Sequence, residues 1–346
     1  MTSREYEERA IPFTAGDGFA LNLINVRNPA QCDLGPVLLV HGAGVRANLF
    51  RAPVDTNIVD ALIAAGYDVW LENWRASIDL PRNPWTLDQA AAFDHPAAVQ
   101  TVCKETGRTR IKAIIHCQGS TSFMMSAVAG LVPQVDTIVA NAVTLHPVVP
   151  AWSAAKLRFA EPIIRLLTPY LDCQWGNHAP DLTAWFVTSL VRLSHHECSN
   201  TVCKMVSFTY GSGFPALWLH ENLNDATHEW IRREFGHVPL SFLRQMALCV
   251  VRGRLVAYEK LPGLPDDYTA ARPQTDARFA LFAGDKSRCF LPESQVRTHA
   301  YLSQLRQDYH TLHRLPGYSH LDVFMGKSAD KEVFPLILHE LAQPTR

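Results

Sequence analysis

Short runs of apolar, β-branched residues alternate along the chain with longer stretches whose apolar positions recur at helical spacing. Glycines at 16 and 18 separate two β-rich segments, which predicts a hairpin within residues 11–27. Continuous apolar runs at residues 36–40 and 67–71 predict buried strands, with a helix at 55–65 between them. Strands of this kind are typical of a parallel sheet that is covered on both faces.

The same rhythm continues to about residue 140 and returns near the C-terminus. Further strands are predicted at residues 110–116, 135–140, 278–283 and 309–315, and further helices at residues 94–107, 120–130, 293–305 and 331–341. Asp94 is expected to cap the first of these helices, which admits Pro96 in its first turn. Alternating strands and helices predict an α/β fold with a mostly parallel sheet and helices on both faces.

Residues 150–275 interrupt this alternation. Apolar positions at helical spacing dominate there, and prolines divide the region into short pieces. We interpret it as a helical cap inserted into the sheet domain. The predicted organisation is therefore a core in two parts, residues 1–149 and 276–346, with the cap between them.

Charge and cysteine content narrow the function classes. Thirty-two Lys and Arg balance thirty-three Asp and Glu without basic runs, which argues against nucleic acid or an anionic membrane as partner. The first ten residues are polar and charged, and no apolar run reaches spanning length, so we expect a soluble cytoplasmic protein without an integral membrane segment. Eight scattered cysteines predict mostly free thiols.

The strand at residues 110–116 ends at Cys117, and small residues follow it into a helix. Strand, sharp turn and helix form a nucleophile elbow, in which one reactive side chain rises above the sheet edge. The usual G-x-S-x-G pattern reads here as Ile115, Cys117 and Gly119, so two of its three marked positions differ. A helix N-terminus and a nearby imidazolium would both favour the Cys117 thiolate.

Two other strand ends carry the residue types that a cysteine nucleophile needs. Asp285 follows the strand at 278–283, and His320 follows the strand at 309–315. His320 would take the thiol proton, and Asp285 would fix the imidazole tautomer. The backbone N–H groups of Ala43 and Gln118 would bind the oxyanion.

Plainer interpretations exist for each of these residues. Cys117 alone could be a packed thiol, Asp285 a turn residue and His320 a hydrogen-bonded loop histidine. Their joint occurrence, in the order nucleophile, acid, histidine, favours the triad, because this order is the one found in α/β-hydrolases. His41 is expected to support its own loop.

A second cluster of His and Cys occupies residues 195–203 of the predicted cap. Cys198 and Cys203 could take part in a zinc site or a disulfide, but a zinc site needs a clear second pair of ligands, so ordinary helical packing is preferred and no metal is predicted. His116, Tyr210 and His220 are the candidate contacts to substrate.

Several segments resemble the acid lipase family of α/β-hydrolases, which includes gastric and lysosomal lipases. They are YDVWLENWRAS at residues 67–77, HCQG at 116–119 and HLDVF at 320–324. Cap segments at residues 198–228, with PGYSHLDVFMGK at 316–327, are similar to hydrolase modules found fused to or beside cholesterol-oxidase-like flavoproteins. The family pattern has serine where Cys117 stands, and cysteine at this position is similar to dienelactone hydrolases and polyhydroxyalkanoate synthases.

The resemblance implies the same triad and oxyanion donors, an α/β-hydrolase fold, and an ester or thioester substrate with an apolar group under the cap. Together with the residue pattern it predicts a hydrolase that forms an acyl-enzyme on a carboxylic ester, lactone or thioester, without a cofactor. Two rivals stay open: an acyltransferase or bond-forming enzyme that uses the same cysteine, and a non-catalytic binding protein with this fold.

Overall fold

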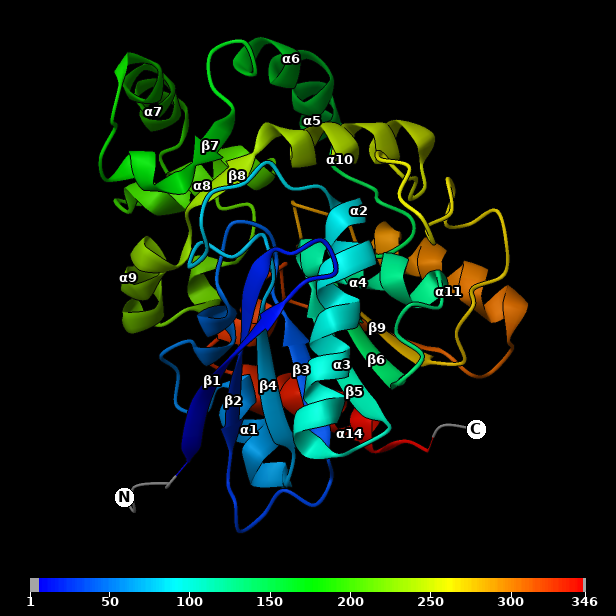
Figure 1. Ribbon diagram of the computed structural model, residues 1–346. Coiled ribbons are helices and arrows are strands. Elements are labelled where there is room, and N and C mark those ends of the chain that lie inside the picture. Colours follow the sequence, from blue (N-terminus) through cyan, green and yellow to red (C-terminus); the bar gives the residue numbers. More distant parts are fainter. Residues whose placement is uncertain (1–5, 345–346) are drawn as a thin grey trace.

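A computed structural model describes residues 6–344 of the chain. Within them an eight-stranded sheet has the order β1-β2-β4-β3-β5-β6-β9-β10 (Figure 1). The strands from β4 to β10 run parallel, and β1 and β2 are antiparallel to their neighbours. The bounds are β1 (Glu7–Thr14), β2 (Ala20–Arg27), β3 (Pro36–Val40), β4 (Asp68–Asn73), β5 (Ile111–His116), β6 (Val135–Asn141), β9 (Arg278–Gly284) and β10 (Thr311–Leu315).

Helices cover both faces of this sheet. One face packs against α3 (His95–Thr106), α4 (Cys117–Val128) and α11 (Glu293–Leu305), and the other against α1 (Ile58–Ala65) and α14 (Phe334–Ala342). Strands β3 and β4 are fully buried because every residue in them faces one of these two layers. The predicted α/β architecture and hairpin are confirmed.

Short helical segments complete the core. They are η1 (Ala47–Arg51), α2 (Leu87–Gln89), η2 (Ala90–Asp94), α12 (Asp322–Met325) and α13 (Ala329–Glu332). The helix predicted at residues 331–341 is therefore two helices, α13 and α14.

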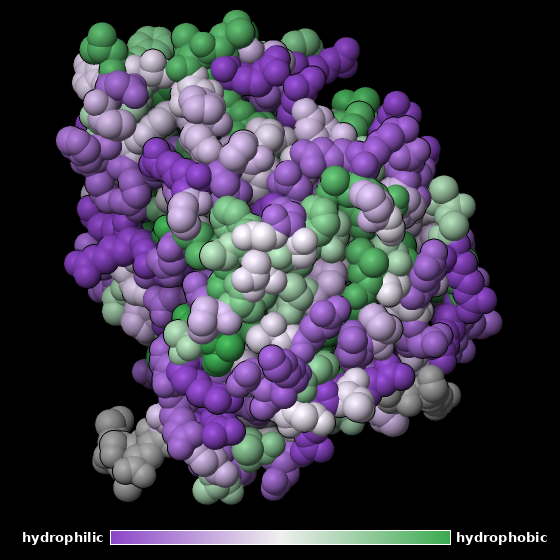
Figure 2. Space-filling view, viewed as in Figure 1, coloured by the Kyte–Doolittle hydropathy of each residue, from purple (hydrophilic) through white to green (hydrophobic). Residues whose placement is uncertain are grey.

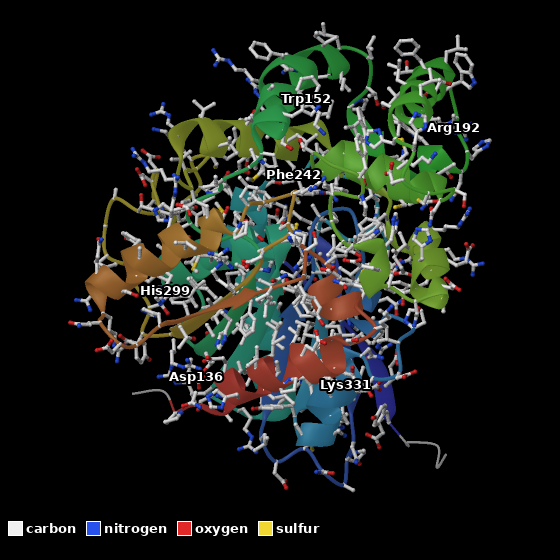
Figure 3. The ribbon with its side chains drawn as sticks, turned by 180° about the vertical axis from the view of Figure 1, so that it is seen from behind. Asp136, Trp152, Arg192, Phe242, His299 and Lys331 are labelled. Atoms are coloured by element: carbon white, nitrogen blue, oxygen red, sulfur yellow. The ribbon has the colours of Figure 1, made fainter. Side chains whose placement is uncertain are left out.

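The segment between β6 and β9 lies over the carboxyl ends of the strands (Figure 1). Seen from behind, its labelled Trp152 and Arg192 lie at the opposite end of the molecule from Asp136 and Lys331 (Figure 3). Its elements are α5 (Ala151–Ala155), η3 (Lys156–Ala160), α6 (Glu161–Ile164), β7 (Tyr170–Asp172), η4 (Cys173–Gly176), α7 (Leu182–Ser194), α8 (Thr201–Tyr210), η5 (His220–Asn222), α9 (Asp225–Glu234), β8 (His237–Pro239) and α10 (Leu240–Arg252). We call this segment the cap.

Asp94 does not cap a helix, contrary to the sequence prediction. The helix begins earlier, where Thr86 and Gln89 form a capping box, and it runs on through η2 into α3. The Asp94 carboxylate instead accepts hydrogen bonds from the buried Arg75 guanidinium at 2.6 Å, and Asp17 binds the same guanidinium at 2.9 Å. A buried arginine needs such partners, and this requirement outweighs the local capping preference.

Within residues 6–344, no helix combines the length and apolarity that crossing a bilayer requires.

Candidate active site

Cys117 occupies a strained turn between β5 and α4. Its φ is 55°, in the left-handed region that residues with a side chain rarely adopt. Strand β5 lies in the middle of the parallel sheet, between β3 and β6, so the turn emerges at the carboxyl edge under the cap. Strain at this position is characteristic of a nucleophile elbow.

The loop after β3 packs directly against this elbow. A Cβ added to Gly42 would lie 2.9 Å from Cys117 Cβ and 3.3 Å from its Sγ, so only glycine permits the approach. The buried His41 imidazole bonds the Gly42 carbonyl through Nδ1 at 2.7 Å, and burial lowers its pKa to about 3, which keeps it neutral. Ala43 follows in the same loop, and the Gln118 N–H lies in the first turn of α4, where helical partners are lacking.

His320 lies at the same edge, in the loop after β10. Ligand atoms of His116, Cys117 and His320 all lie within 4.8 Å of one another. The His320 N–H donates to the Leu217 carbonyl at 3.1 Å, and Asn141 Nδ2 donates to the His320 carbonyl at 3.0 Å. Neither ring nitrogen of His320 has a hydrogen-bond partner among the described residues, so the imidazole is available to the sulfur.

Asp285 does not meet His320. Its carboxylate accepts a hydrogen bond from Arg314 Nε at 2.8 Å and is partly exposed. The cause is the register of the edge strand: β10 pairs Arg314 with Ala283, which brings the guanidinium beside Asp285. The structure thus brings together the predicted nucleophile and histidine, while the predicted acid is held by a different partner.

Cys289 is a neighbour of the nucleophile that the sequence interpretation missed. A hydrogen bond from the Cys289 thiol, aided by His320 and the Gln118 N–H, holds the pKa of Cys117 well below its usual range although burial opposes this. Burial and the Cys117 charge raise the pKa of Cys289, so Cys289 stays protonated and acts as the donor. Each of the eight cysteines is a free thiol.

Replacing Cys289 with alanine should therefore raise the pKa of Cys117. The thiolate fraction at neutral pH would fall, and the midpoint of the pH profile for alkylation of Cys117 would move up toward the free-thiol value of about 8.5. Iodoacetamide labelling at a series of pH values, with peptide mapping, measures this midpoint. Cys249→Ala, a buried cysteine on α10, is the matched control; an unmoved midpoint in Cys289→Ala would contradict the role given to Cys289.

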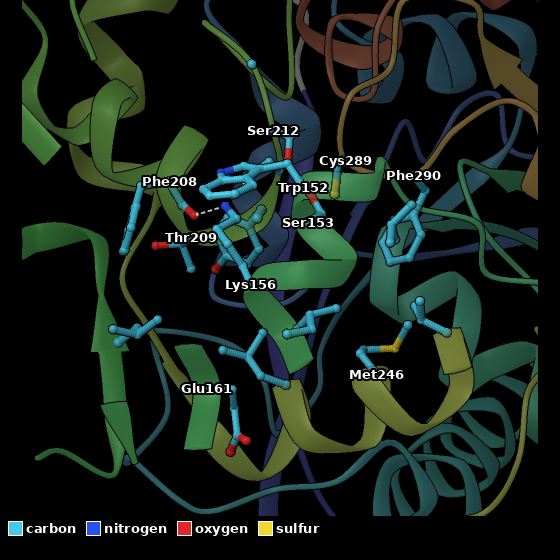
Figure 4. Close-up of a pocket in the computed structure, with 18 of the residues that line it drawn as sticks. Trp152, Ser153, Lys156, Glu161, Phe208, Thr209, Ser212, Met246, Cys289 and Phe290 are labelled. Atoms are coloured by element: carbon cyan, nitrogen blue, oxygen red, sulfur yellow. Dashed lines mark hydrogen bonds between the residues drawn. The ribbon is translucent and has the colours of Figure 1, made fainter. Parts of the chain in front are cut away.

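A cavity of about 420 Å³ opens above Cys117 and Gln118. Its wall is formed by cap side chains and by the loop after β9 (Figure 4). Most of the lining is apolar, including Val149, Leu157, Phe208, Phe242, Met246 and Phe290. Such a cavity suits an apolar ligand group placed next to the sulfur.

Lys156 is the cation in this lining. Its Nζ donates to the carbonyls of Phe208, at 2.7 Å, and Gly211, at 2.5 Å. Figure 4 shows the first of these contacts as a dashed line. Burial lowers its pKa to about 8. These two hydrogen bonds therefore connect η3, which begins at Lys156, to the C-terminal end of α8.

The three predicted substrate contacts have different surroundings. Tyr210 lines the cavity and donates its hydroxyl to the Ala43 carbonyl at 3.1 Å. His116 is buried beside His320, with ring centroids 4.9 Å apart, and its Nδ1 accepts from Asn141. His220 lies with Cys203, 3.4 Å from Nε2 to Sγ, in another part of the cap. Only Tyr210 is thus among the residues that line the cavity.

A hydroxyl, an imidazole and a carboxylate also meet inside the core. His95 Nε2 lies 2.7 Å from Ser122 Oγ, and His95 Nδ1 lies 2.9 Å from Glu72 Oε1. All three side chains are fully buried, and none lines the cavity. Their arrangement is that of a Ser-His-Glu triad, but it has no access to a substrate.

Metal ligation is a second chemical use of the donors around Cys117. One thiol and two imidazoles make a three-ligand set that a catalytic zinc ion accepts. The strained turn and the adjoining apolar cavity correspond more closely to a nucleophile.

Known proteins with similar sequences are lipases and esterases. No family model matches the chain. Lipase member K from Homo sapiens is 22% identical over 358 residues, covering 95% of this chain and 86% of that lipase. Sterol esterase 2 from Saccharomyces cerevisiae is 24% identical over 185 residues, covering 46% of this chain but only 33% of the esterase. The predicted cytoplasmic location and the association with flavoproteins stay predictions.

Solved structures show the fold. A lipase in its open form matches 97% of this chain and 98% of its own length with a TM-score of 0.59 and 13% sequence identity. The chain has the α/β-hydrolase fold, and its similarity among curated proteins is to lipases and esterases.

Proposed function

We propose that the protein hydrolyses carboxylic esters or thioesters of an apolar acyl group, with Cys117 as nucleophile and His320 as the general acid and base. The observation that carries this proposal is the position of the Cys117 sulfur. It lies on a strained elbow, within 4.8 Å of an unpartnered imidazole, at the base of an apolar cavity. The similarity to lipases and esterases supports the same reaction class.

In the first half-reaction the Cys117 thiolate would attack the carbonyl carbon of the ester. The N–H groups of Ala43 and Gln118 would bind the oxyanion, and the His320 imidazolium would give its proton to the departing alcohol or thiol. A thioester on Cys117 remains. His320 would then take a proton from water, hydroxide would attack the thioester, and the acid and the thiolate would be released.

A pair rather than a triad is chemically sufficient for a thiol. The lowered pKa of Cys117 supplies the thiolate without a strong base, so His320 needs no carboxylate to raise its basicity. A serine in the same position would need that assistance. This difference supports cysteine chemistry in a site where Asp285 is paired with Arg314.

The exposed surface of the cap supports a lipid-like substrate. Most of the large apolar side chains exposed in the described part of the chain lie on α5 to α7, and Figure 2 shows apolar residues gathered at the cap end of the molecule. They include Trp152, Phe159, Ile163, Leu166, Leu167, Leu182, Trp185, Phe186, Leu190 and Leu193. Exposed apolar patches of this kind mark sites that contact proteins, membranes or apolar ligands.

Intact-mass spectrometry tests the proposal directly. Brief exposure to p-nitrophenyl esters of increasing chain length, quenched in acid, should add one acyl mass that peptide mapping locates on Cys117. Longer apolar chains should give more adduct than acetate because the cavity is apolar. Adding alcohol or thiol acceptors separates hydrolysis from transfer by product; no adduct with any ester, together with no turnover, would instead indicate a non-catalytic binding protein.

A further inference from the structure

Four potential metal ligands converge in the cap, away from the cavity. They are Cys198, Cys203, His220 and His228, and their ligand atoms all lie within 4.8 Å of one another. Cys203 Sγ lies 3.4 Å from His220 Nε2. We propose that these four residues bind one zinc ion in a tetrahedral Cys₂His₂ site that has a structural role.

The geometry corresponds to that of zinc. Bond lengths of about 2.3 Å to sulfur and 2.0–2.1 Å to nitrogen place tetrahedral ligands roughly 3.3–3.8 Å apart. The Cys203–His220 separation already falls in this range. All four ligand atoms lie within 4.8 Å of one another. Two thiolates would neutralise the charge of the ion, which removes most of the cost of burying it.

Buried polar groups around the cluster point to a ligand. Nε2 of His228 is buried and has no hydrogen-bond partner in the described structure. The indole N–H of Trp218 is also buried, beside the Cys203 sulfur. A zinc ion would satisfy the imidazole, and a metal-bound thiolate would accept from the indole.

Asn200 holds two of the ligand segments in place. Its Oδ1 accepts from the N–H of Cys203 at 3.1 Å, at the start of α8. Its Nδ2 donates to the carbonyl of His228 at 2.8 Å, on α9. These two bonds hold the backbone of α8 next to that of α9, so that Cys203 and His228 stay close together.

A Cys198–Cys203 disulfide explains less of the cluster. It would use both sulfurs, but it would not explain why the imidazoles of His220 and His228 lie beside them, with ring centroids 4.9 Å apart. Ordinary packing would bury apolar side chains here in preference to four ligands. The second ligand pair that the sequence lacked near Cys198 is supplied by residues 22 and 30 positions further on.

The site would tie the cap to the His320 loop. The segment that ends at His220 contains Leu217, whose carbonyl accepts the N–H groups of His320 and Leu321. Asn222, two residues after His220, donates to the Asp322 carboxylate at 2.8 Å. Zinc would therefore fix the backbone that holds His320, although it would take no part in the reaction.

Metal content of the full-length chain tests this. Protein purified without chelator should contain one zinc ion per chain by inductively coupled plasma mass spectrometry. After zinc removal under reducing conditions, cobalt(II) should give the intense visible bands of tetrahedral coordination and a sulfur-to-cobalt charge-transfer band. Because the cobalt spectrum uses the unaltered chain, it does not depend on how variants fold.

Variants locate the site. Cys203→Ser and His228→Ala should lose the zinc, while Cys249→Ser, a buried cysteine on α10, should keep it. Cys117→Ala should also keep it, which separates this cluster from the ligands at the elbow. Zinc retained in both ligand variants, an octahedral cobalt spectrum, or a Cys198–Cys203 disulfide with no metal uptake after reduction would each overturn the proposal.

Discussion

Replacing Cys117 with alanine is expected to abolish the acyl adduct and to lower the turnover of an activated ester by on the order of 10⁴-fold or more. In the proposed mechanism the Cys117 sulfur is the atom that forms the covalent intermediate, and no other thiol lies on the elbow. Alanine keeps the left-handed backbone no worse than cysteine does, so the fold should persist. Initial rates with a p-nitrophenyl ester and intact-mass spectra measure both effects.

Cys249→Ala provides the matched control for this experiment. Cys249 is also buried, but it lies on α10 with its thiol directed to the Val256 carbonyl, and it does not line the cavity. Its loss should leave turnover nearly unchanged. Residual turnover in Cys117→Ala equal to that of Cys249→Ala would refute covalent catalysis by Cys117.

Replacing His320 with alanine is expected to lower turnover by about 10²–10⁴-fold, the usual contribution of general acid–base catalysis. His320 also helps to lower the pKa of Cys117, so alkylation of Cys117 at neutral pH should slow down. Rates of ester turnover and of iodoacetamide labelling, followed across pH, report these two effects separately. A purely structural histidine would not move the alkylation midpoint.

Asp285→Asn is the variant to compare with His320→Ala. Because Asp285 is paired with Arg314 and not with His320, this substitution should change turnover by only a few fold. A loss as large as that of His320→Ala would show instead that Asp285 leaves Arg314 and completes a triad when substrate binds.

Much of the fold was predictable from local sequence. The run that forms β3 is apolar throughout, and the run that forms β5 is apolar except at Lys112 and at its last residue, His116. Both strands are largely buried on their two faces, and such runs are recognisable without tertiary information. The elbow was predictable for a related reason: the change from strand to helix at Cys117 is a local pattern. The antiparallel pair of β7 with β8 was not predicted, since two three-residue strands more than sixty positions apart carry no local signal.

The site was predictable only as far as strand ends could be aligned. Cys117 and His320 meet because parallel strands deliver their loops to one edge. Asp285 also follows a parallel strand. Its carboxylate, however, pairs with Arg314 on the neighbouring strand, and the spacing of residues in the sequence does not reveal this contact. The positions of Cys289 and of the four cap residues proposed to bind zinc depend on how distant loops pack. The periodicity of the local sequence does not predict that packing.

The buried contact of Ser122, His95 and Glu72 bears on how catalytic constellations are searched for by geometry. A template of a hydroxyl bonded to an imidazole bonded to a carboxylate would select this trio and pass over Cys117, although a phosphonate reagent in solvent has no path to Ser122. Access to the cavity, and not a complete hydrogen-bonded triad, therefore distinguishes the proposed nucleophile Cys117 from the buried Ser122.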